Sequence, residues 1–372
     1  MRNRLHSITL RGYKSIRELD CFHPRNLTAL IGPNGAGKSN FISFFRMMSW
    51  MLADAANLQF YVAERGGASS LLHDGPEVTR EIEAKLSLHS DSGENEYAFR
   101  LFYAAGDALI FADERYRFSR RDFYDGLAPW TETGAGHRAP MLLQMGSNDN
   151  TAYVIQNMLR RIIVHQFHNT SDTARMRTKW LASDNRYLKE DAANIAPVLL
   201  RLRESGNRYY RRIVDAIRMI LPFFSEFELE PDNGHLLLAW HERSSDRVFD
   251  VSQASDGMLR VIALVTLLLQ PEEDLPDVLI LDEPELGLHP YAITVIGGLI
   301  ASVSMETQVI VATQSMALID CFETEDIVVV ERKGRSSTFR QLNEDDLKDW
   351  LNDYSLSELW EKNVVGGRPS WG

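Results

Sequence analysis

Eight residues near the N-terminus, GPNGAGKS (32–39), have the types and spacing of a phosphate-binding loop. The pattern G-x-x-x-x-G-K-[ST] surrounds phosphate oxygens with backbone N–H groups, and it adds an ammonium at Lys38 and a hydroxyl at Ser39. An apolar strand pattern, LTALI, precedes the loop, and a helical pattern, NFISFFRMM, follows it. The start of that helix adds the positive end of its dipole, so ATP with Mg²⁺ is the predicted ligand. The predicted nucleotide-binding residues are Gly32, Pro33, Asn34, Gly35, Ala36, Gly37, Lys38, Ser39 and Asn40.

A second stretch, VLILDEPELGLHP (278–290), ends an apolar strand in two adjacent acids, Asp282 and Glu283. Two carboxylates at the end of a buried strand are costly unless a cation lies beside them. Beside a phosphate-binding loop that cation is Mg²⁺, and we expect Ser39 and Asp282 to hold it. Glu283 is then predicted to orient or polarise the water that attacks the terminal phosphate.

Two further stretches contain candidate phosphate-contacting residues. QASDGMLRVIAL (253–264) places Ser255 and Gly257 at the start of an apolar helix, where capping and the helix dipole favour an anion. Taken alone, this serine is more often a helix cap without a ligand. VIVATQS (309–315) is a strand pattern that ends at Gln314.

The elements that position these residues follow from hydrophobic periodicity. Residues 81–118 alternate as an antiparallel meander, residues 185–224 have a helical period, and 255–270 are typical of a buried helix. From 278 onward strand and helix patterns alternate, which indicates a parallel α/β sheet interrupted by a long insertion. We expect an N-terminal lobe (1–165), a helical insertion or lid (166–235) and a C-terminal lobe (236–372).

Composition limits the class of protein. The chain has 372 residues, 44% of them hydrophobic and 25% charged, which is ordinary for a globular protein of about two lobes. It contains only two cysteines and no apolar run that approaches the roughly 20 residues of a membrane span. We therefore expect a cytoplasmic protein without thiolate metal sites and without a membrane partner.

The net charge of −12 is unevenly distributed. Residues 151–220 carry 13 Lys and Arg against 6 Asp and Glu, whereas residues 221–372 carry 10 against 28. Arginines with interleaved aromatic residues occur in two stretches, 115–123 and 208–218, and this pattern suits nucleic-acid binding. A solvated face that pairs with the acidic remainder explains the same pattern equally well. The residues concerned are Arg115, Tyr116, Arg117, Phe118, Arg120, Arg121, Phe123, Arg208, Tyr209, Tyr210, Arg211, Arg212 and Arg218.

Together these motifs resemble an ABC-type ATPase of the SMC/RecF/OLD-like branch, within a small family of predicted AAA ATPases. The resemblance runs from ITLRGYKSI through GPNGAGKS, SDG, LDEPELGLHP and ATQS to SELWEKNVVGGRP near the C-terminus. It implies a P-loop ATPase head of the α/β class with a mixed or parallel sheet, an antiparallel β meander and an α-helical insertion.

The resemblance also implies roles for single residues. Ser255 and Gly257 are expected to bind the γ-phosphate of ATP held by the other protomer, and Gln314 stands where many members have a histidine sensor. Gln166, within HQFHNTS (165–171), is the candidate for the glutamine that meets Mg²⁺ and water. His289 replaces the aspartate that transporters and SMC proteins have at this position.

Lys14 is similar to a residue that meets nucleotide in RecF-like heads, although an ordinary exposed lysine fits the same sequence.

The predicted activity is ATP hydrolysis coupled to an ATP-dependent homodimer that acts on DNA or RNA, in genome defence or repair. The resemblance implies a separately encoded nuclease-like or Toprim-like partner. One alternative is the ATP-binding subunit of an ABC transporter, but about 240 residues separate Lys38 from Asp282, more than transporter domains usually allow. A small-molecule kinase is a further alternative. Glu283 and the SDG helix disfavour it.

Overall fold

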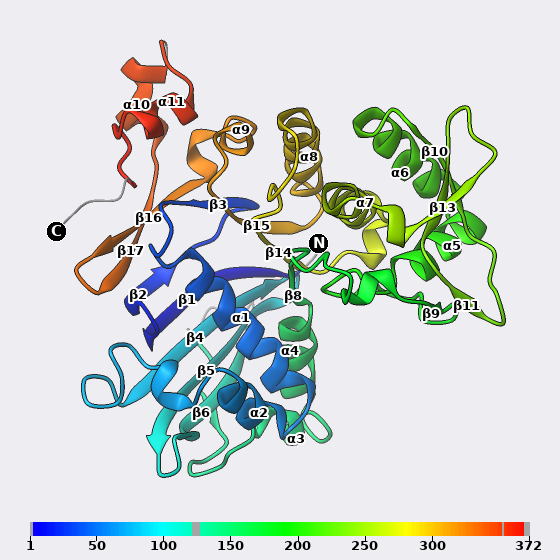
Figure 1. Ribbon diagram of the computed structural model, residues 1–372. Helices are drawn as coiled ribbons and strands as arrows, with labels where there is room; N and C mark the ends of the chain where they lie inside the picture. The colour runs from blue at the N-terminus through cyan, green and yellow to red at the C-terminus, as the bar shows by residue number, and fades with distance from the viewer. Residues whose placement is uncertain (1–2, 121–126, 352, 368–372) are drawn as a thin grey trace.

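The computed structural model describes residues 3–120, 127–351 and 353–367 and has a mixed α/β fold built on two six-stranded sheets (Figure 1). The predicted fold class is therefore confirmed. Helices lie between the sheets and on the outer face of the central sheet, and a further lobe of helices and short strands extends from one side. None of the described helices is long and apolar enough to cross a membrane.

The central sheet has the strand order β17-β16-β3-β15-β14-β8. Four of its five strand pairings are parallel, and β17 is antiparallel to β16. Every residue of β3, β14 and β15 is buried, as expected for strands covered on both faces. Because these strands are parallel, their carboxyl ends meet at one edge. The strands are β3 (Leu27–Ile31), β8 (Ile162–His165), β14 (Val278–Asp282), β15 (Gln308–Thr313), β16 (Ile327–Lys333) and β17 (Ser336–Gln341).

Alternate residues of the central strands face two different cores. Leu279 and Leu281 belong to the core beneath the outer helices, whereas Val278 and Ile280 belong to the core that contains α1. This division is the period of two expected of a strand. Helix α7 is buried almost throughout, which explains why its sequence is apolar on all sides. The outer helices are α7 (Asp256–Leu269), α8 (Pro290–Val303) and α9 (Met316–Ile319).

The second sheet contains the antiparallel meander that the alternating residues predict. Its order is β2-β1-β4-β5-β6-β7, and the apolar residues of β4 and β5 face α1 and the smaller helices. Its strands are β1 (Arg4–Tyr13), β2 (Ile16–Phe22), β4 (Glu81–Ser90), β5 (Gly93–Ala104), β6 (Ala108–Arg120) and β7 (Thr131–Glu132). The associated helices are α1 (Lys38–Ala53), α2 (Asn57–Glu64), α3 (Leu142–Met145) and α4 (Asn150–Arg160).

The side lobe packs on α7 and is seen at the right of Figure 1. Its helical part begins only at Ile195, ten residues later than the predicted helical segment. The preceding loop is held by the buried side chain of Asn194, which accepts from the N–H of Lys189 and donates to the carbonyls of Asp184 and Tyr187. The elements of the lobe are α5 (Ile195–Ser205), α6 (Asn207–Ile220), β9 (Trp180–Leu181), β10 (Phe224–Glu228), β11 (His235–Leu236), β12 (Ala239–Glu242) and β13 (Val248–Asp250).

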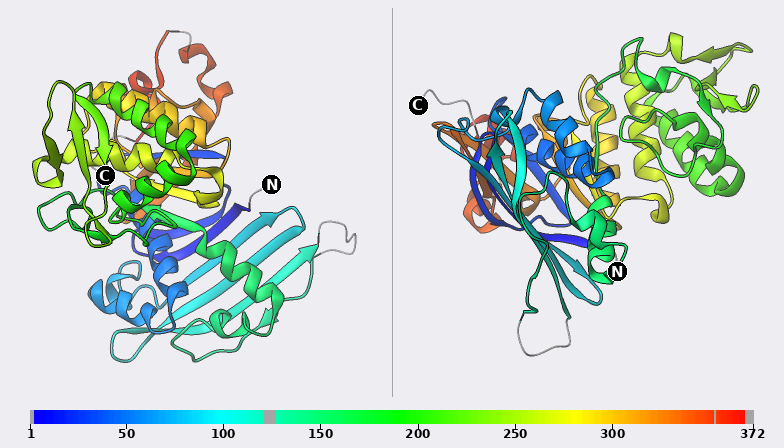
Figure 2. Two further views of the ribbon diagram at one scale, coloured as in Figure 1. Left: turned by 90° about the vertical axis from the view of Figure 1, so that its right-hand side faces the viewer. Right: turned by 90° about the horizontal axis from the view of Figure 1, so that it is seen from below.

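Two short helices, α10 (Glu344–Leu351) and α11 (Leu356–Glu361), follow β17 and lie at the top of Figure 1. Figure 2 shows the second sheet and the side lobe as separate bodies on either side of the central sheet.

A buried glutamine joins the two sheets. Gln308 begins β15 with only 3% of its surface exposed, and its side chain accepts from the N–H of Leu5 in β1 at 2.8 Å. Its amide nitrogen donates to the carbonyls of Leu5, Pro24 and Arg25 at 3.0–3.1 Å. One side chain therefore satisfies backbone groups of β1 and of the turn that precedes β3.

We expect Gln308→Leu to destabilise the fold by about 2–4 kcal/mol, because it leaves several buried backbone groups without partners. The free energy of unfolding in urea is the measurement. Gln144→Ala, on the exposed face of α3, is the matched control and should change it by less than about 0.5 kcal/mol. Equal effects of the two substitutions would contradict the role of Gln308.

Candidate nucleotide site

Three segments meet at the carboxyl ends of β3, β14 and β15. The phosphate-binding loop joins β3 to α1, Glu283 follows β14, and Gln314 follows β15. They enclose a cavity of about 80 Å³. The residues that line it are Pro33, Asn34, Gly35, Gly37, Lys38, Ser39, Asn40, Glu283 and Gln314. The structure thus brings the predicted loop together with an acid and an amide about 250 and 280 positions along the chain.

The loop is held from behind by serines. Ser337 of β17 donates to the carbonyl of Ala36 at 2.6 Å and lies 2.7 Å from the hydroxyl of Ser15, to which Asn40 also donates. Gly37 has a φ of 119°, and a Cβ there would lie 2.0 Å from the Ser337 hydroxyl oxygen. A larger residue at position 37 would therefore shift the loop and the first N–H groups of α1, which are the groups expected to bind an anion.

Lys38 points back into its own loop. It is 4% exposed, and its ammonium donates to the carbonyl oxygens of Gly32, at 2.5 Å, and Pro33, at 3.2 Å. Burial lowers the pKa of this ammonium, because the interior solvates a cation less well than water does. Phosphate oxygens would give the Lys38 ammonium a fully charged partner, whereas the two carbonyl oxygens carry only partial negative charge.

Asp282 has one satisfied and one unsatisfied carboxylate oxygen. Its Oδ2 accepts from the amide of Gln166 at 3.1 Å and lies 3.4 Å from the guanidinium of Arg46. Its Oδ1 is buried and makes no hydrogen bond within the described part of the chain. Burial is the main cause that raises the pKa of this carboxyl. An unpartnered buried oxygen is costly, and a cation would offset that cost.

The oxygen donors fit Mg²⁺. A carboxylate at Asp282, a hydroxyl at Ser39 and an amide oxygen at Gln166 are the hard ligands that this ion prefers, with water completing the shell. Gln166 now directs its amide nitrogen toward Asp282 and His168, so its oxygen would turn toward a metal only after a rotation of the amide.

Glu283 and Gln314 form a bridge to the loop. The amide nitrogen of Gln314 donates to Glu283 Oε1 at 2.8 Å and to Asn34 Oδ1 at 2.7 Å. Glu283 has a φ of 45°, a left-handed conformation that costs about 1–3 kcal/mol in a residue other than glycine. Its N–H still pairs with Ala312 at 2.8 Å, so β15 helps to maintain this conformation.

The predicted residues Ser255, Gly257 and His289 lie outside the cavity lining. Ser255 caps α7, with its hydroxyl accepting from the N–H of Met258 at 3.2 Å, and His289 caps α8 through the N–H of Tyr291 at 3.2 Å. Gly257 lies against the loop after Glu283, since a Cβ there would be 3.2 Å from the carbonyl oxygen of Gly287. Within one chain these residues have local structural contacts.

Lys14 lies behind the loop rather than in the cavity. Its ammonium donates to Ser43 on α1 at 3.0 Å, and its φ is 50°. Burial, followed by the charges of Arg65 and Arg46, lowers the pKa of Lys14 to about 8. It is therefore not the ordinary exposed lysine considered above.

Two residues near the site were missed by sequence reasoning. Arg46 reaches Asp282 from α1, seven residues and two helical turns after Ser39, and that spacing was the signal that could have identified it. Glu285 accepts from the Thr313 hydroxyl at 2.6 Å and from the N–H of Gln314 at 3.0 Å, so it orients the end of β15. Burial raises the pKa of the Glu285 carboxyl.

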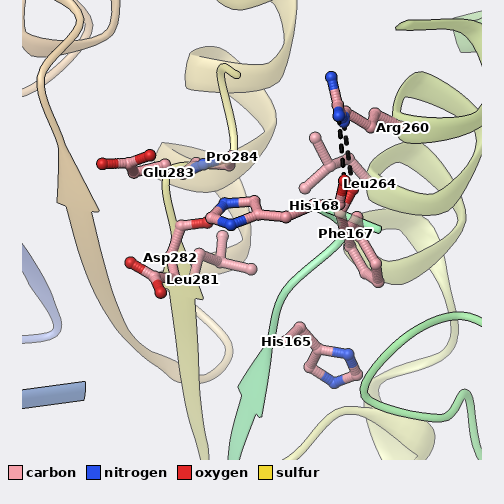
Figure 3. A pocket seen from close by; sticks show the side chains of 9 residues that line it. All are labelled: His165, Phe167, His168, Arg260, Leu264, Leu281, Asp282, Glu283 and Pro284. Carbon is pink, nitrogen blue, oxygen red and sulfur yellow. Dashed lines mark hydrogen bonds between the residues drawn. The ribbon is translucent and has the colours of Figure 1, made fainter. Parts of the chain in front are cut away.

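A narrow pocket lies on the other side of the β14 end (Figure 3). The carboxylates of Asp282 and Glu283 project away from Arg260, while the ring of His168 reaches the carbonyl of Asp282 at 3.0 Å. His165 is buried, and burial lowers its pKa to about 4, so its ring is neutral at pH 7. Of the two histidines that flank Gln166, His168 therefore contacts the end of β14, and His165 is a buried, neutral residue of β8.

The first basic stretch is largely internal. Tyr116 is fully buried and donates to Asp149 at 2.9 Å, and Arg117 forms a buried ion pair with Glu96 and lies over the ring of Trp130. The prediction that Tyr116 and Arg117 contact nucleic acid is therefore wrong. Arg121 and Phe123 lie outside the described residues.

The second basic stretch divides between the two faces of α6. Tyr210 is buried and bonds to Glu226, and Arg218 pairs with Asp215 and Glu226. Arg208, Arg211 and Arg212 are exposed on the side of α6 opposite Tyr210.

Comparison with known proteins agrees with this geometry. Residues 27–320 match the family described as "AAA domain, putative AbiEii toxin, Type IV TA system". The chain is 30% identical over 157 residues to the chromosome partition protein Smc of Xanthomonas oryzae pv. oryzae, an alignment that covers 38% of this chain. The alignment covers 12% of the length of that Smc protein.

Solved SMC heads share the fold at low sequence identity. A SMC head bound to the C-terminal winged-helix domain of ScpA has a TM-score of 0.62 and 15% identity, over 93% of this chain and 99% of the other. The Pyrococcus furiosus SMC head with an extended coiled coil, bound to the C-terminal domain of ScpA, has a TM-score of 0.60 and 14% identity, over 94% and 99%. Since the family match spans most of the chain and includes the loop, Asp282, Glu283 and Gln314, this protein belongs to that AAA family of P-loop ATPases and has the fold of an SMC head.

Proposed function

We propose that the protein hydrolyses MgATP and that two copies close over two ATP molecules to regulate a nucleic-acid-directed process. The observation that carries the proposal is the meeting of Lys38, Glu283 and Gln314 around one cavity, beside the unsatisfied carboxylate of Asp282. A nucleotide-binding module without hydrolysis would not need an acid at position 283 held in a strained conformation.

The residues divide the work of hydrolysis. The loop N–H groups and Lys38 would bind the β- and γ-phosphates. Ser39, Asp282 and Gln166 would hold Mg²⁺, which would supply positive charge beside the phosphate oxygens. Glu283 accepts a proton from the attacking water. The oxygen of that water bonds to the γ-phosphorus as the bond between the γ-phosphorus and ADP breaks. Gln314, bonded to Glu283 and Asn34, positions the acid against the γ-phosphate side of the loop.

Dimer closure explains the residues left outside the cavity. Ser255 and Gly257 lie at the exposed start of α7, and His289, Leu286 and Tyr291 are exposed nearby. In a head-to-tail pair each Ser255 would complete the site of the other protomer, with the N-terminus of α7 directed at the γ-phosphate.

The downstream process is genome defence or DNA repair. The Smc relative is a chromosome partition protein. The description of the matched family names a toxin of a toxin–antitoxin system. The similar SMC head that is bound to a domain of ScpA supports a separately encoded protein partner. That this partner is nuclease-like or Toprim-like rests on the resemblance of the motifs alone. The rival function, an ABC transporter subunit, predicts that the protein co-purifies with membranes of its host.

The first prediction concerns nucleotide affinity. Lys38→Ala should weaken MgATP binding by about 30- to 150-fold, because about 2–3 kcal/mol of charge-assisted contacts are lost. Isothermal titration calorimetry measures this, and Lys333→Ala at the exposed end of β16 is the control, with unchanged affinity expected. Equal affinity of the Lys38 variant and the parent would remove the basis of the nucleotide site.

The second prediction separates binding from hydrolysis. Glu283→Gln should bind MgATP with near-parent affinity, hydrolyse it about 10²- to 10⁴-fold more slowly and accumulate as a dimer, because the base is lost and the shape is kept. Ser255→Arg should bind nucleotide and remain a monomer. Phosphate release and sedimentation velocity, each with and without MgATP, are the measurements.

Glu306→Gln, at an exposed position in the turn after α8, is the matched control and should behave as the parent. A Glu283→Gln chain that stays monomeric with ATP bound would refute closure, and one that hydrolyses ATP at the parent rate would refute the role of Glu283.

The third prediction concerns nucleic acid. Replacing Arg208, Arg211 and Arg212 together with Gln should weaken binding of a DNA or RNA oligonucleotide and flatten its salt dependence by about one unit of slope per lost phosphate contact. Fluorescence anisotropy at several salt concentrations measures both quantities.

Replacing Arg65, Arg100 and Arg335, which are exposed elsewhere, is the control of equal charge. If both triple variants change the slope equally, the face of α6 has no special role.

A further inference from the structure

A second cavity, of about 210 Å³, lies between α6, α7 and α8. These helices are neighbours in the upper right of Figure 1, and the residues that line the cavity are different from those that line the nucleotide cavity. One buried water molecule needs only about 10–15 Å³, so this cavity has room for a small organic molecule. Its lining combines apolar, amide and charged side chains, and each kind restricts the ligand that fits.

The buried part of the lining is apolar. Leu268 and Leu269 are the last residues of α7, and Leu275 follows them; all three are buried. Leu299 and Val303 belong to the last turns of α8. Five aliphatic side chains from two helices and the segment after α7 favour a ligand that has an apolar side chain of its own.

Gln270 is a buried polar residue of the same lining. It is 5% exposed, and its Oε1 makes no hydrogen bond within the described part of the chain. A buried amide oxygen without a donor is costly. An N–H group of a ligand would remove that cost, and a charged N–H group would form the stronger bond.

The end of α7 also favours a positively charged donor. Gln270 ends the helix without a backbone capping bond among the described residues, and Pro271, which follows, has no N–H to donate. The last carbonyl groups of a helix carry the negative end of its dipole. Helix α8 ends at Val303 against the same cavity, so its dipole adds to the negative potential.

Charged side chains of both signs reach the exposed part of the lining. Arg212 comes from α6, and Glu272 comes from the segment after α7. Glu272 lies two residues after Gln270, so a carboxylate that favours a cation is close to the amide in sequence. Arg212 instead favours a carboxylate, which a guanidinium can bind through two N–H groups. The lining therefore suits a ligand with an ammonium, a carboxylate and an apolar side chain.

We propose that this cavity binds a free α-amino acid with an apolar side chain. The ammonium would lie at Gln270 and the end of α7, the carboxylate at Arg212, and the side chain against the leucines. The inference goes beyond the proposed function and does not depend on it. Because Arg212 belongs to α6 and Gln270 follows α7, the ligand would also link the side lobe to the central part of the molecule.

The first test compares ligands that differ by one group. L-Leucine and the larger L-phenylalanine are titrated by calorimetry, and at least one should bind the parent with a dissociation constant of about 1 mM or tighter. N-Acetyl-L-leucine lacks the ammonium and L-leucinamide lacks the carboxylate, so each should bind at least about fivefold more weakly than L-leucine. L-Alanine lacks most of the apolar side chain and should bind about tenfold more weakly.

The second test uses variants of the lining. Gln270→Met removes the buried acceptor with little change of size and should weaken L-leucine binding at least about fivefold. Arg212→Gln should weaken L-leucine binding and leave L-leucinamide binding unchanged, because the amide has no carboxylate for the arginine. Glu273→Gln is the matched control, since Glu273 is exposed beside Glu272 but does not line the cavity, and its affinity should equal that of the parent.

Several outcomes would overturn the proposal. The parent could bind neither L-leucine nor L-phenylalanine, or Gln270→Met could bind L-leucine as well as the parent does. Equal binding of L-leucinamide would indicate the N-terminal residue of a peptide, and equal binding of N-acetyl-L-leucine would indicate a C-terminal residue; either excludes a free amino acid as the ligand. The comparison of ligands uses only the parent, so it decides the question even where a variant does not fold.

Discussion

The unsatisfied carboxylate of Asp282 is the interaction on which the rest of the site depends. Its strand is buried along its whole length, and its Oδ1 has no partner within the described residues. A carboxylate in this position raises the free energy of the folded chain unless a cation is supplied, and the neighbouring groups supply only part of the compensation. Arg46, Gln166 and the carbonyl contact of His168 hold the strand end in place without satisfying that oxygen. The strand end therefore has a free oxygen of the kind that would bind a metal ion.

Such a site requires a rigid surround, and the two sheets provide it. Gln308 ties β1 to the start of β15, and Ser15 and Ser337 hold the loop from the side opposite the cavity. Both contacts join residues about 300 positions apart in the chain. The antiparallel sheet is thus a support for the loop, in addition to being a hydrophobic cover for α1.

The opposite side of Asp282 has a different character. There the contacts run from backbone carbonyls to two arginines, Arg177 and Arg260, and the acceptors belong to loops. Loops held by side-chain bonds can change position at lower cost than strands held by a ladder of backbone bonds. The two sides of Asp282 are thus held by different sets of contacts.

Contiguous motifs allowed much of this protein to be predicted from its sequence. The loop at 32–39, the acids at 282 and 283 and the alternation in 81–118 each depend on neighbours in the chain, so the sequence alone determined the fold class and the residues around the cavity. The hydrophobic period also identified α7 as buried. It could say which face of an element is covered, but not which residue covers it.

Tertiary structure decided the contacts between distant polar residues. The aromatic and basic residues of 115–118 alternate as suits an exposed binding strand, yet Tyr116 is buried because β6 lies inside a sheet covered by α4, and Arg117 meets Glu96 on the adjacent strand. Arg46 reaches Asp282 from 236 positions away, and Arg177 reaches Ala254 from 77. The helical spacing of Arg46 from Ser39 indicates its face of α1 but not its partner, because hydrogen bonds depend on where the folded elements meet. Only the packing of the sheets and the side lobe determines that.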